Sequence, residues 1–430
     1  MTASHFTSVD LPSTSGPQSD GRQLQETSVR EPARPLPSQS GRLDYIDALR
    51  GAAAVQVLLS HATLAFFPNI VLASVMSGGV LGYLAATPLL FPLDGASAVC
   101  IFFALSGYVL TPLFARSQAT GAALILSRFA RLGVPAVAGC LLSAVLFQIF
   151  SEYNLSAARL LNSQWLAENW RPSADLWFLR DALVHGVLLG FRGDSIAQWF
   201  GVPASALPET SNSYLAPLWT LSIEFYGSIL VLILARSRSR TFLILASIVF
   251  SRGYLICFVA GHAAARFRLG EDKPATPWPV AAAIATAGVL LCMAGHSWTP
   301  GPVLSICALT PQIFPPCPSF NPAYLMRIYG ATVFTVAVMQ CAPARAFLGH
   351  QRLRALGRLS FPIYLTHWPI IFGVSCFVFV ALAPWLGMRG ARSVAMIAGV
   401  ALALVAAVAF ERVDQYALRV SRVLREQKTL

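Results

Sequence analysis

The first apolar stretch of the sequence contains an arginine and a histidine eleven positions apart, Arg50 and His61. In a helix, eleven steps of about 100° return the chain to within roughly 20° of the same face. At about 1.5 Å per residue, His61 lies roughly 16 Å from Arg50, near the middle of a ~30 Å hydrocarbon layer if Arg50 marks its boundary. An ionisable group at that depth is costly and indicates a function, and an imidazole accepts protons near neutral pH. His61 is therefore a candidate general base, and a histidine that only hydrogen-bonds a neighbouring helix is the structural alternative.

Glu224 is a second charged residue inside an apolar run. Counted from Tyr214, it lies roughly 15 Å below the opposite surface, at the same depth as His61. A carboxylate there should face the protein and a partner, which could be the second imidazole nitrogen or an arginine. A purely structural ion pair is the alternative. Trp219 and Ser222 could shape the same wall, although Trp219 could equally belong to an interfacial aromatic belt.

Four further side chains are candidates for binding. Arg128 and Arg131 are three residues apart at the start of an apolar run, and guanidinium groups bind phosphate with two parallel hydrogen bonds. They could also be ordinary charge anchors of a membrane helix. Tyr364 and His367 lie near Pro369 in a late apolar run. His367 could bind substrate, but a hydrogen bond to a helix loosened by Pro369 is the interpretation we favour.

The composition places these residues in a membrane protein. Of the 430 residues, 56% are hydrophobic and only 12% are charged, which is far from the soluble average. Several apolar runs approach or exceed eighteen residues and do not alternate, so we predict an all-α, polytopic transmembrane helix bundle. About ten spans are expected, at residues 46–66, 97–115, 131–150, 215–235, 241–250, 254–266, 278–295, 324–341, 360–383 and 391–410.

Charge and polarity divide the chain further. The formal net charge is +12, but the basic residues flank apolar runs, so nucleic acid is not an expected partner. Residues 1–42 are polar and are expected to be a disordered cytosolic tail. The transmembrane domain would cover 43–411, followed by a basic cytosolic tail at 412–430. None of the eight cysteines forms a close metal-type pair, so we expect no metal site.

Two segments cannot be assigned to single membrane-spanning helices from the sequence. Residues 241–267 must hold two short apolar runs with only three residues between them. They form either a re-entrant hairpin or a single crossing helix. Residues 176–191 contain Arg180, Asp181 and His185, and are expected to form an interfacial helix.

Five segments in order along the chain resemble the membrane acyltransferase-3 family, particularly its fungal members. The first has the family's arginine, ten residues and a histidine, and the others are similar to its second-helix, third-helix, Trp-Ser-Glu and late Ser-Tyr-His motifs. They read LDYIDALRGAAAVQVLLSH (43–61), FFALSGYVL (102–110), RFARLGVP (128–135), LWTLSIEFYG (218–227) and LSFPIYLTHWP (359–369). The resemblance extends over nearly the whole membrane region.

The resemblance implies an O-acyltransferase that moves an acyl group, most simply acetyl, from acyl-CoA to a hydroxyl of a glycan or small metabolite. Acyl-CoA would be a donor substrate and no cofactor would be permanently bound. His61 would be the base, with Arg50 and Glu224 supporting it; Arg128 and Arg131 would hold donor phosphates.

Two interpretations other than an enzyme remain. The protein could be a transporter in which the buried Arg, His and Glu form a proton or anion relay, or it could be a non-enzymatic scaffold. The resemblance to fungal members implies location in a eukaryotic endomembrane or plasma membrane.

Overall fold

The computed structural model describes residues 44–70, 88–172, 177–193, 195–270, 276–297 and 322–426, all within the unit Ser40–Leu430. The expected N-terminal tail lies outside the described residues. Those described form helices and connecting segments without a β-strand, which confirms the all-α prediction.

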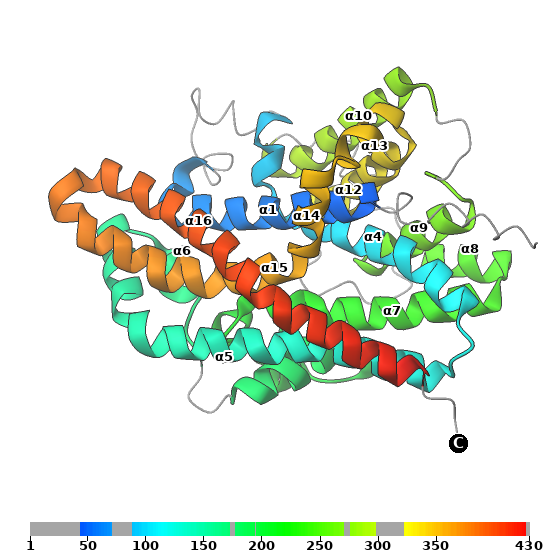
Figure 1. Ribbon diagram of the computed structural model, residues 1–430, viewed down its shortest axis with the longest axis horizontal. Helices are drawn as coiled ribbons and strands as arrows, with labels where there is room; N and C mark the ends of the chain where they lie inside the picture. Colours follow the sequence, from blue (N-terminus) through cyan, green and yellow to red (C-terminus); the bar gives the residue numbers. More distant parts are fainter. Residues whose placement is uncertain are drawn as a thin grey trace, which may run out of the picture. The chain divides into compact units, whose positions relative to one another are not determined.

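Three of the long helices, α1, α5 and α7, lie roughly along one direction (Figure 1). The long helices are α1 (Asp44–Phe66), α4 (Gly95–Arg116), α5 (Gly121–Leu161), α7 (Trp219–Ser237), α10 (Trp278–Ser297), α12 (Pro322–Gln340) and α16 (Cys376–Glu426). The shorter α-helices are α6 (Gln164–Glu168), α8 (Arg240–Val249), α9 (Leu255–Arg266), α13 (Ala342–Leu348), α14 (Gln351–Arg358) and α15 (Ser360–Pro369). Two π-helices are η3 (Arg180–Leu189) and η8 (Ile370–Ser375). The 3₁₀ turns are η2 (Pro88–Leu93), η4 (Ile196–Phe200), η5 (Ala204–Ala206), η6 (Thr210–Asn212) and η7 (Ala216–Leu218).

The helices make the chain a multi-pass integral membrane protein. Within the described residues, five are long and apolar enough to cross a bilayer, or up to six if the bent pair of α12 and α13 counts as one. The expectation of about ten spans is larger partly because it includes the short α8 and α9. It also divides 360–426 in two, and the structure does contain a break there, since Gly387 has a positive φ of 64° inside α16. That conformation favours glycine.

The α8 and α9 helices form an antiparallel hairpin. The guanidinium of Arg266, at the end of α9, donates hydrogen bonds to the carbonyl oxygens of Arg238 and Ser239, just before α8. With ten and twelve residues, the helices are about 15 and 18 Å long, too short to cross a ~30 Å hydrocarbon layer. Of the two interpretations of 241–267, the hairpin agrees with the structure.

Residues 180–189 form a helix that is packed into the protein. Asp181 and His185 are buried, and η3 packs against α5 and α7. The Asp181 carboxylate accepts hydrogen bonds from the Ser213 hydroxyl and the Tyr214 amide, both at 2.8 Å. Burial raises the pKa of Asp181 to about 6. These bonds fix the chain where it approaches α7, the helix that carries Glu224.

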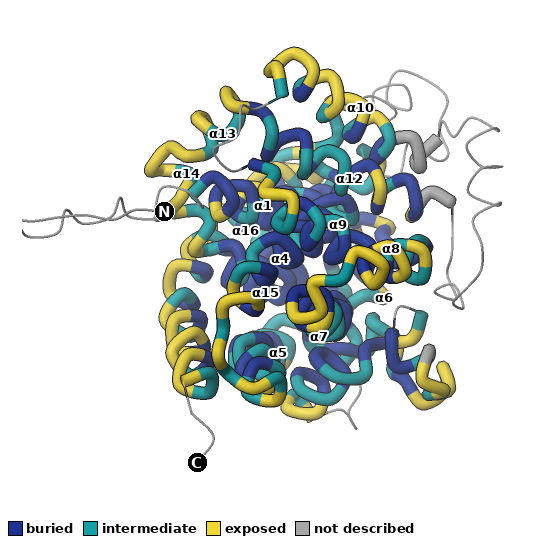
Figure 2. Tube along the Cα trace, turned by 90° about the vertical axis from the view of Figure 1, so that its right-hand side faces the viewer, coloured by how far each residue is buried: buried dark blue, intermediate teal, exposed yellow. Residues whose placement is uncertain are grey.

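The core lies along α1 and α4, where buried residues are concentrated in an end-on view (Figure 2). Helices α4 and α9 approach closely because Gly107 and Gly261 face each other's backbone. A Cβ atom on Gly107 would collide with the Phe258 carbonyl oxygen, and one on Gly261 with the Ala104 carbonyl oxygen. Such small residues allow membrane helices to pack at short range.

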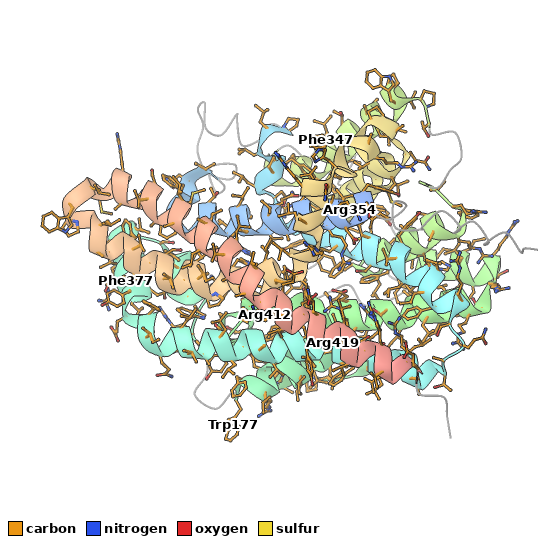
Figure 3. All side chains as sticks on the ribbon, viewed as in Figure 1. Trp177, Phe347, Arg354, Phe377, Arg412 and Arg419 are labelled. Carbon is orange, nitrogen blue, oxygen red and sulfur yellow. The ribbon has the colours of Figure 1, made fainter. Side chains whose placement is uncertain are left out.

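The last helix, α16, continues without interruption past the boundary expected at residue 412 and ends at Glu426. Its C-terminal part packs beside α5 (Figure 1), and the Ser127 and Ser421 hydroxyls lie 2.9 Å apart. Arg412 and Arg419 project from this part of the helix (Figure 3). Residues 412–426 are therefore a continuation of the bundle.

Candidate active site

A cavity of about 210 Å³ lies between α1, α4, α5, α7, α15 and α16. One wall consists largely of apolar side chains of α4. The polar side chains include five of the nine predicted site residues: Arg50, Arg128, Arg131, Glu224 and Tyr364. The structure therefore brings together residues from four helices that are far apart in the sequence.

Glu224 pairs with an arginine and not with an imidazole. Its Oε1 lies 3.1 Å from Nη2 of Arg128 and accepts a longer hydrogen bond, 3.4 Å, from the Ser106 hydroxyl. Nε of Arg128 donates to the Ser228 hydroxyl at 3.1 Å. Two helices, α5 and α7, thus fix this guanidinium in the cavity wall.

Arg131 pairs with Asp414 of α16. Its Nη1 and Nη2 donate to the two carboxylate oxygens at 2.6 and 3.1 Å, the two-bond geometry typical of arginine and carboxylate. The guanidinium also lies over the ring of Phe361, 5.2 Å from its centre. Arg50 differs from both arginines, because its buried Nε has no hydrogen-bond partner among the described residues.

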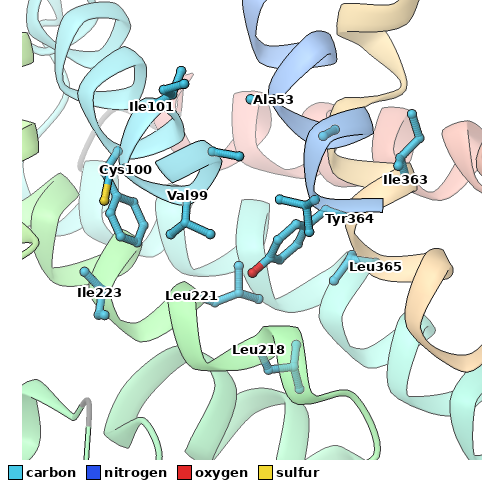
Figure 4. Packing of buried hydrophobic residues seen from close by; sticks show 14 of the residues in the cluster. Ala53, Val99, Cys100, Ile101, Leu218, Leu221, Ile223, Ile363, Tyr364 and Leu365 are labelled. Carbon is cyan, nitrogen blue, oxygen red and sulfur yellow. The ribbon is translucent and has the colours of Figure 1, made fainter. Parts of the chain in front are cut away.

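Tyr364 closes the cavity on the side of α15. Its hydroxyl donates to the Pro217 carbonyl oxygen at 2.8 Å and lies 2.8 Å from the Thr220 hydroxyl. The ring packs between α4 and α7, beside Val99 and Leu221 (Figure 4). These contacts join the start of α7 to α15.

His61 and His367 form a hydrogen-bonded pair, with 2.9 Å between Nδ1 of His61 and Nε2 of His367. Nδ1 of His367 lies 3.0 Å from the carbonyl oxygen of Ile363, which can only accept a hydrogen bond. For two neutral rings, His367 must then carry its proton on Nδ1 and accept at Nε2. His61 must donate from Nδ1, which leaves a lone pair on its Nε2. The hydrogen bonds therefore orient His61 as a base.

Two tryptophans flank the ring of His61, which is partly buried. The Trp165 ring on α6 stacks 6.1 Å from it, and the Trp368 ring meets it edge-on at 5.1 Å. Trp165 and Trp368 also contact Phe372. This aromatic cluster limits the space around the imidazole and lowers its contact with water.

The histidine pair and the arginine cavity are linked through α15. Tyr364 lines the cavity, His367 follows one turn later, and their ring centres are 6.0 Å apart. Arg50 and His61 provide the same link along α1, as their spacing predicts. The arrangement offers guanidinium groups for an anionic ligand at one place and an oriented base at another, which suits acyl transfer from a charged donor.

Comparison with known proteins identifies the family. Residues 43–412 match the family described as an acyltransferase domain, acyltransferase-3. This chain belongs to the acyltransferase-3 family. It is also 26% identical to the O-acetyltransferase PaAT-1 of Phomopsis amygdali over 382 residues, which cover 76% of this chain and 72% of that protein. No solved structure matches the chain significantly.

Membership of the acyltransferase-3 family confirms the resemblance seen in the sequence and makes the chain an enzyme, an acyltransferase. It favours this interpretation over the transporter and the scaffold.

Two residues predicted to bind substrate, Trp219 and Ser222, lie outside both the arginine cavity and the histidine pair. Trp219 packs against Tyr254, with ring centres 5.5 Å apart, and the Ser222 hydroxyl donates to the Trp219 carbonyl oxygen. Neither lines the cavity.

Three residues that contact the candidate site were missed by the sequence analysis. Asp414 falls in the segment expected to be a tail, although an aspartate so soon after an apolar run could have indicated a buried partner. Trp368 directly follows His367 in the late motif, whereas nothing in the sequence distinguishes Trp165.

Proposed function

We propose that this acyltransferase transfers an acyl group from acyl-CoA to a hydroxyl group of a glycan or small metabolite. The observation that carries the proposal is the hydrogen-bond chain from the Ile363 carbonyl through His367 to His61, which leaves Nε2 of His61 able to accept a proton. The name of the O-acetyltransferase relative supports acetyl as the acyl group.

His61 would act as the general base. Its Nε2 takes the proton of the acceptor hydroxyl while the oxygen attacks the thioester carbonyl carbon. The tetrahedral intermediate collapses, the carbon–sulfur bond breaks, and the imidazolium returns the proton to the departing thiolate. The products are an ester and coenzyme A, and His61 is neutral again.

The arginine cavity would hold the phosphates of the donor. Arg50, Arg128 and Arg131 line it, and guanidinium groups match phosphate oxygens well. Along α1, Arg50 and His61 are separated by roughly 16 Å. That separation suits coenzyme A, in which the extended pantetheine arm separates the phosphates from the thioester.

The aromatic cluster would form the acceptor side. Trp165 and Trp368 are near the imidazole, so an acceptor hydroxyl that reaches Nε2 would pass beside their rings. Aromatic rings provide flat apolar surfaces that can pack against the ring of a sugar or of a cyclic metabolite.

Consumption of labelled acetyl-CoA by protein in detergent, with a panel of hydroxyl compounds and product detection by mass spectrometry, tests the proposal. We expect His61→Ala to fold and to lose transfer by about 10²- to 10⁴-fold, the usual contribution of a general base. The control is His350→Ala, since His350 is exposed at the start of α14. Detergent removes any sealed compartment, so thioester consumption also separates catalysis from transport. Wild-type rates in His61→Ala would show that the base is another group.

A further inference from the structure

Most of the arginines that line the cavity are already paired with carboxylates. Of its three arginines, Arg128 faces Glu224 and Arg131 faces Asp414, while Arg50 retains an Nε without a partner among the described residues. Two of the three arginines that a phosphate ligand would meet therefore already have a carboxylate partner.

The two carboxylates are held differently. Glu224 also bonds to Ser106, and its partner Arg128 is fixed by Ser228. Asp414 has only Arg131 as a hydrogen-bond partner among the described residues, and both of its oxygens bind that guanidinium. It lies on the last helix, next to the position of Leu418, which lines the cavity one turn later. Asp414 can thus be displaced without breaking a wider network.

We propose that Asp414 is an exchangeable counter-ion of the donor cavity. When the cavity is empty, its carboxylate neutralises Arg131; when the donor binds, phosphate oxygens replace it on the same guanidinium. The inference rests on the proposed function, because it takes acyl-CoA as the donor. Carboxylate and phosphate both present two oxygens at the spacing of the guanidinium fork, so one can substitute for the other.

This exchange has a consequence for affinity. Donor and product must each displace Asp414, so its presence weakens the binding of both. The empty cavity avoids an unpaired arginine in an apolar surrounding, and coenzyme A can leave after transfer because Asp414 competes for its place.

Isothermal titration of the purified protein in detergent with coenzyme A tests the proposal. Asp414→Asn should bind coenzyme A about tenfold more tightly than wild type, within the usual range of coupling between two ligands. The matched control is Glu411→Gln, on the same helix. Glu411 faces Arg358 at 3.9 Å, and Arg358 does not line the cavity, whereas the partner of Asp414, Arg131, does. The same loss of charge at Glu411 should therefore leave the Kd unchanged.

Unchanged or weaker binding in Asp414→Asn would overturn the inference, because Asp414 would then only hold Arg131 in place for the donor. If wild type itself binds no coenzyme A, the proposed donor is wrong and the inference fails with it. The two failures are therefore distinguishable.

A second pair of variants covers the case in which Asp414→Asn does not fold. Arg131→Gln and the double variant Arg131→Gln/Asp414→Asn leave no unpaired arginine at this position. Without the guanidinium there is nothing to compete for, so both should bind coenzyme A more weakly than wild type, and loss of the Asp414 charge should then change the affinity by much less than tenfold. A gain of about tenfold in the double variant relative to Arg131→Gln would show that Asp414 acts on the ligand by another route, and would overturn the proposal.

Discussion

At the scale of single residues, the backbone carbonyl of Ile363 determines which nitrogen carries the proton in two imidazole rings, those of His367 and His61. The Ile363 oxygen fixes the proton of His367 on Nδ1, and His367 in turn fixes the proton of His61. A ring whose other nitrogen is already hydrogen-bonded is held in one tautomer and one orientation. We therefore propose that His367 is a positioning residue; its bond to the Ile363 carbonyl agrees with the structural interpretation of its sequence position, and the interpretation as a substrate-binding residue stays a prediction.

Replacement of His367 tests this role. We expect His367→Leu to lower kcat for acyl transfer about 100-fold, because Nδ1–H of His61 loses its acceptor and the ring loses its preferred tautomer. KM for acetyl-CoA should change little, since His367 does not line the arginine cavity. The measurement is steady-state kinetics with an acceptor identified in the hydroxyl panel.

The conservative variant His367→Gln separates positioning from packing. Its amide oxygen can accept the hydrogen bond from His61, so we expect partial recovery of kcat relative to His367→Leu. Equal losses in both variants, or a rise in KM for acetyl-CoA as the main effect, would contradict the assigned role.

The spacing of single residues predicted part of the candidate site. Arg50 and His61 could be placed on one face because both lie in the same helix, where periodicity is reliable. Arg128 and Arg131 could be identified for the same reason. The partners Asp414 and Trp165 could not, because they reach the site from other elements, and local sequence does not encode which helices pack together.

At the scale of elements, the crossing of α4 and α9 depends on the absence of side chains. Gly107 and Gly261 each face backbone atoms of the other helix, so backbone, which cannot rotate away, would meet any added methyl group. The α4 helix also forms the apolar wall of the cavity. Its position relative to α9 thus contributes to the shape of the proposed donor site.

Gly261→Ala tests this crossing. We expect a loss of about 1–3 kcal/mol of stability, because an added methyl group overpacks the interface and separates the helices. The measurement is the thermal unfolding midpoint in detergent. The control is Gly121→Ala at the start of α5, where a Cβ would meet nothing within 4 Å; an equal fall in both variants would show that the close crossing is not responsible.

Element type was more predictable than element length. All ten apolar segments predicted from the sequence are helical in the described residues, because long apolar runs in lipid have few other conformations. The expected span 131–150 lies within a 41-residue α5. The part of α5 around Glu152 and Asn154, beyond the expected span, is polar and resembles a loop in sequence. Asn154 is nevertheless buried, so packing maintains the helix there.

At the scale of the whole molecule, several arginine-rich helix ends share one region. Arg236 of α7 donates to the Ala119 carbonyl oxygen between α4 and α5, and Arg266 of α9 donates to the carbonyls before α8. The α6 helix follows the other end of α5. Because arginine and lysine favour the cytosolic side, we expect the first region to face the cytosol and α6 to face the opposite compartment.

Cysteine labelling in sealed, cytosol-side-out vesicles tests this orientation. An impermeant maleimide should label Ser237→Cys directly and Glu168→Cys only after permeabilisation, since both positions are exposed but belong to opposite ends. The wild-type chain gives the background, and the cysteines of the described residues are buried. Labelling of both variants before permeabilisation would contradict the orientation.

The pairing of Arg131 with Asp414 also sets an order of events during synthesis. The two residues are 283 positions apart, so at 5–20 residues per second the arginine is made roughly 14–57 s before its partner. A buried arginine without a counter-ion carries an uncompensated desolvation cost. The nascent chain must tolerate this uncompensated charge until the ribosome has translated the final helix, and a premature stop before Asp414 would leave it uncompensated permanently.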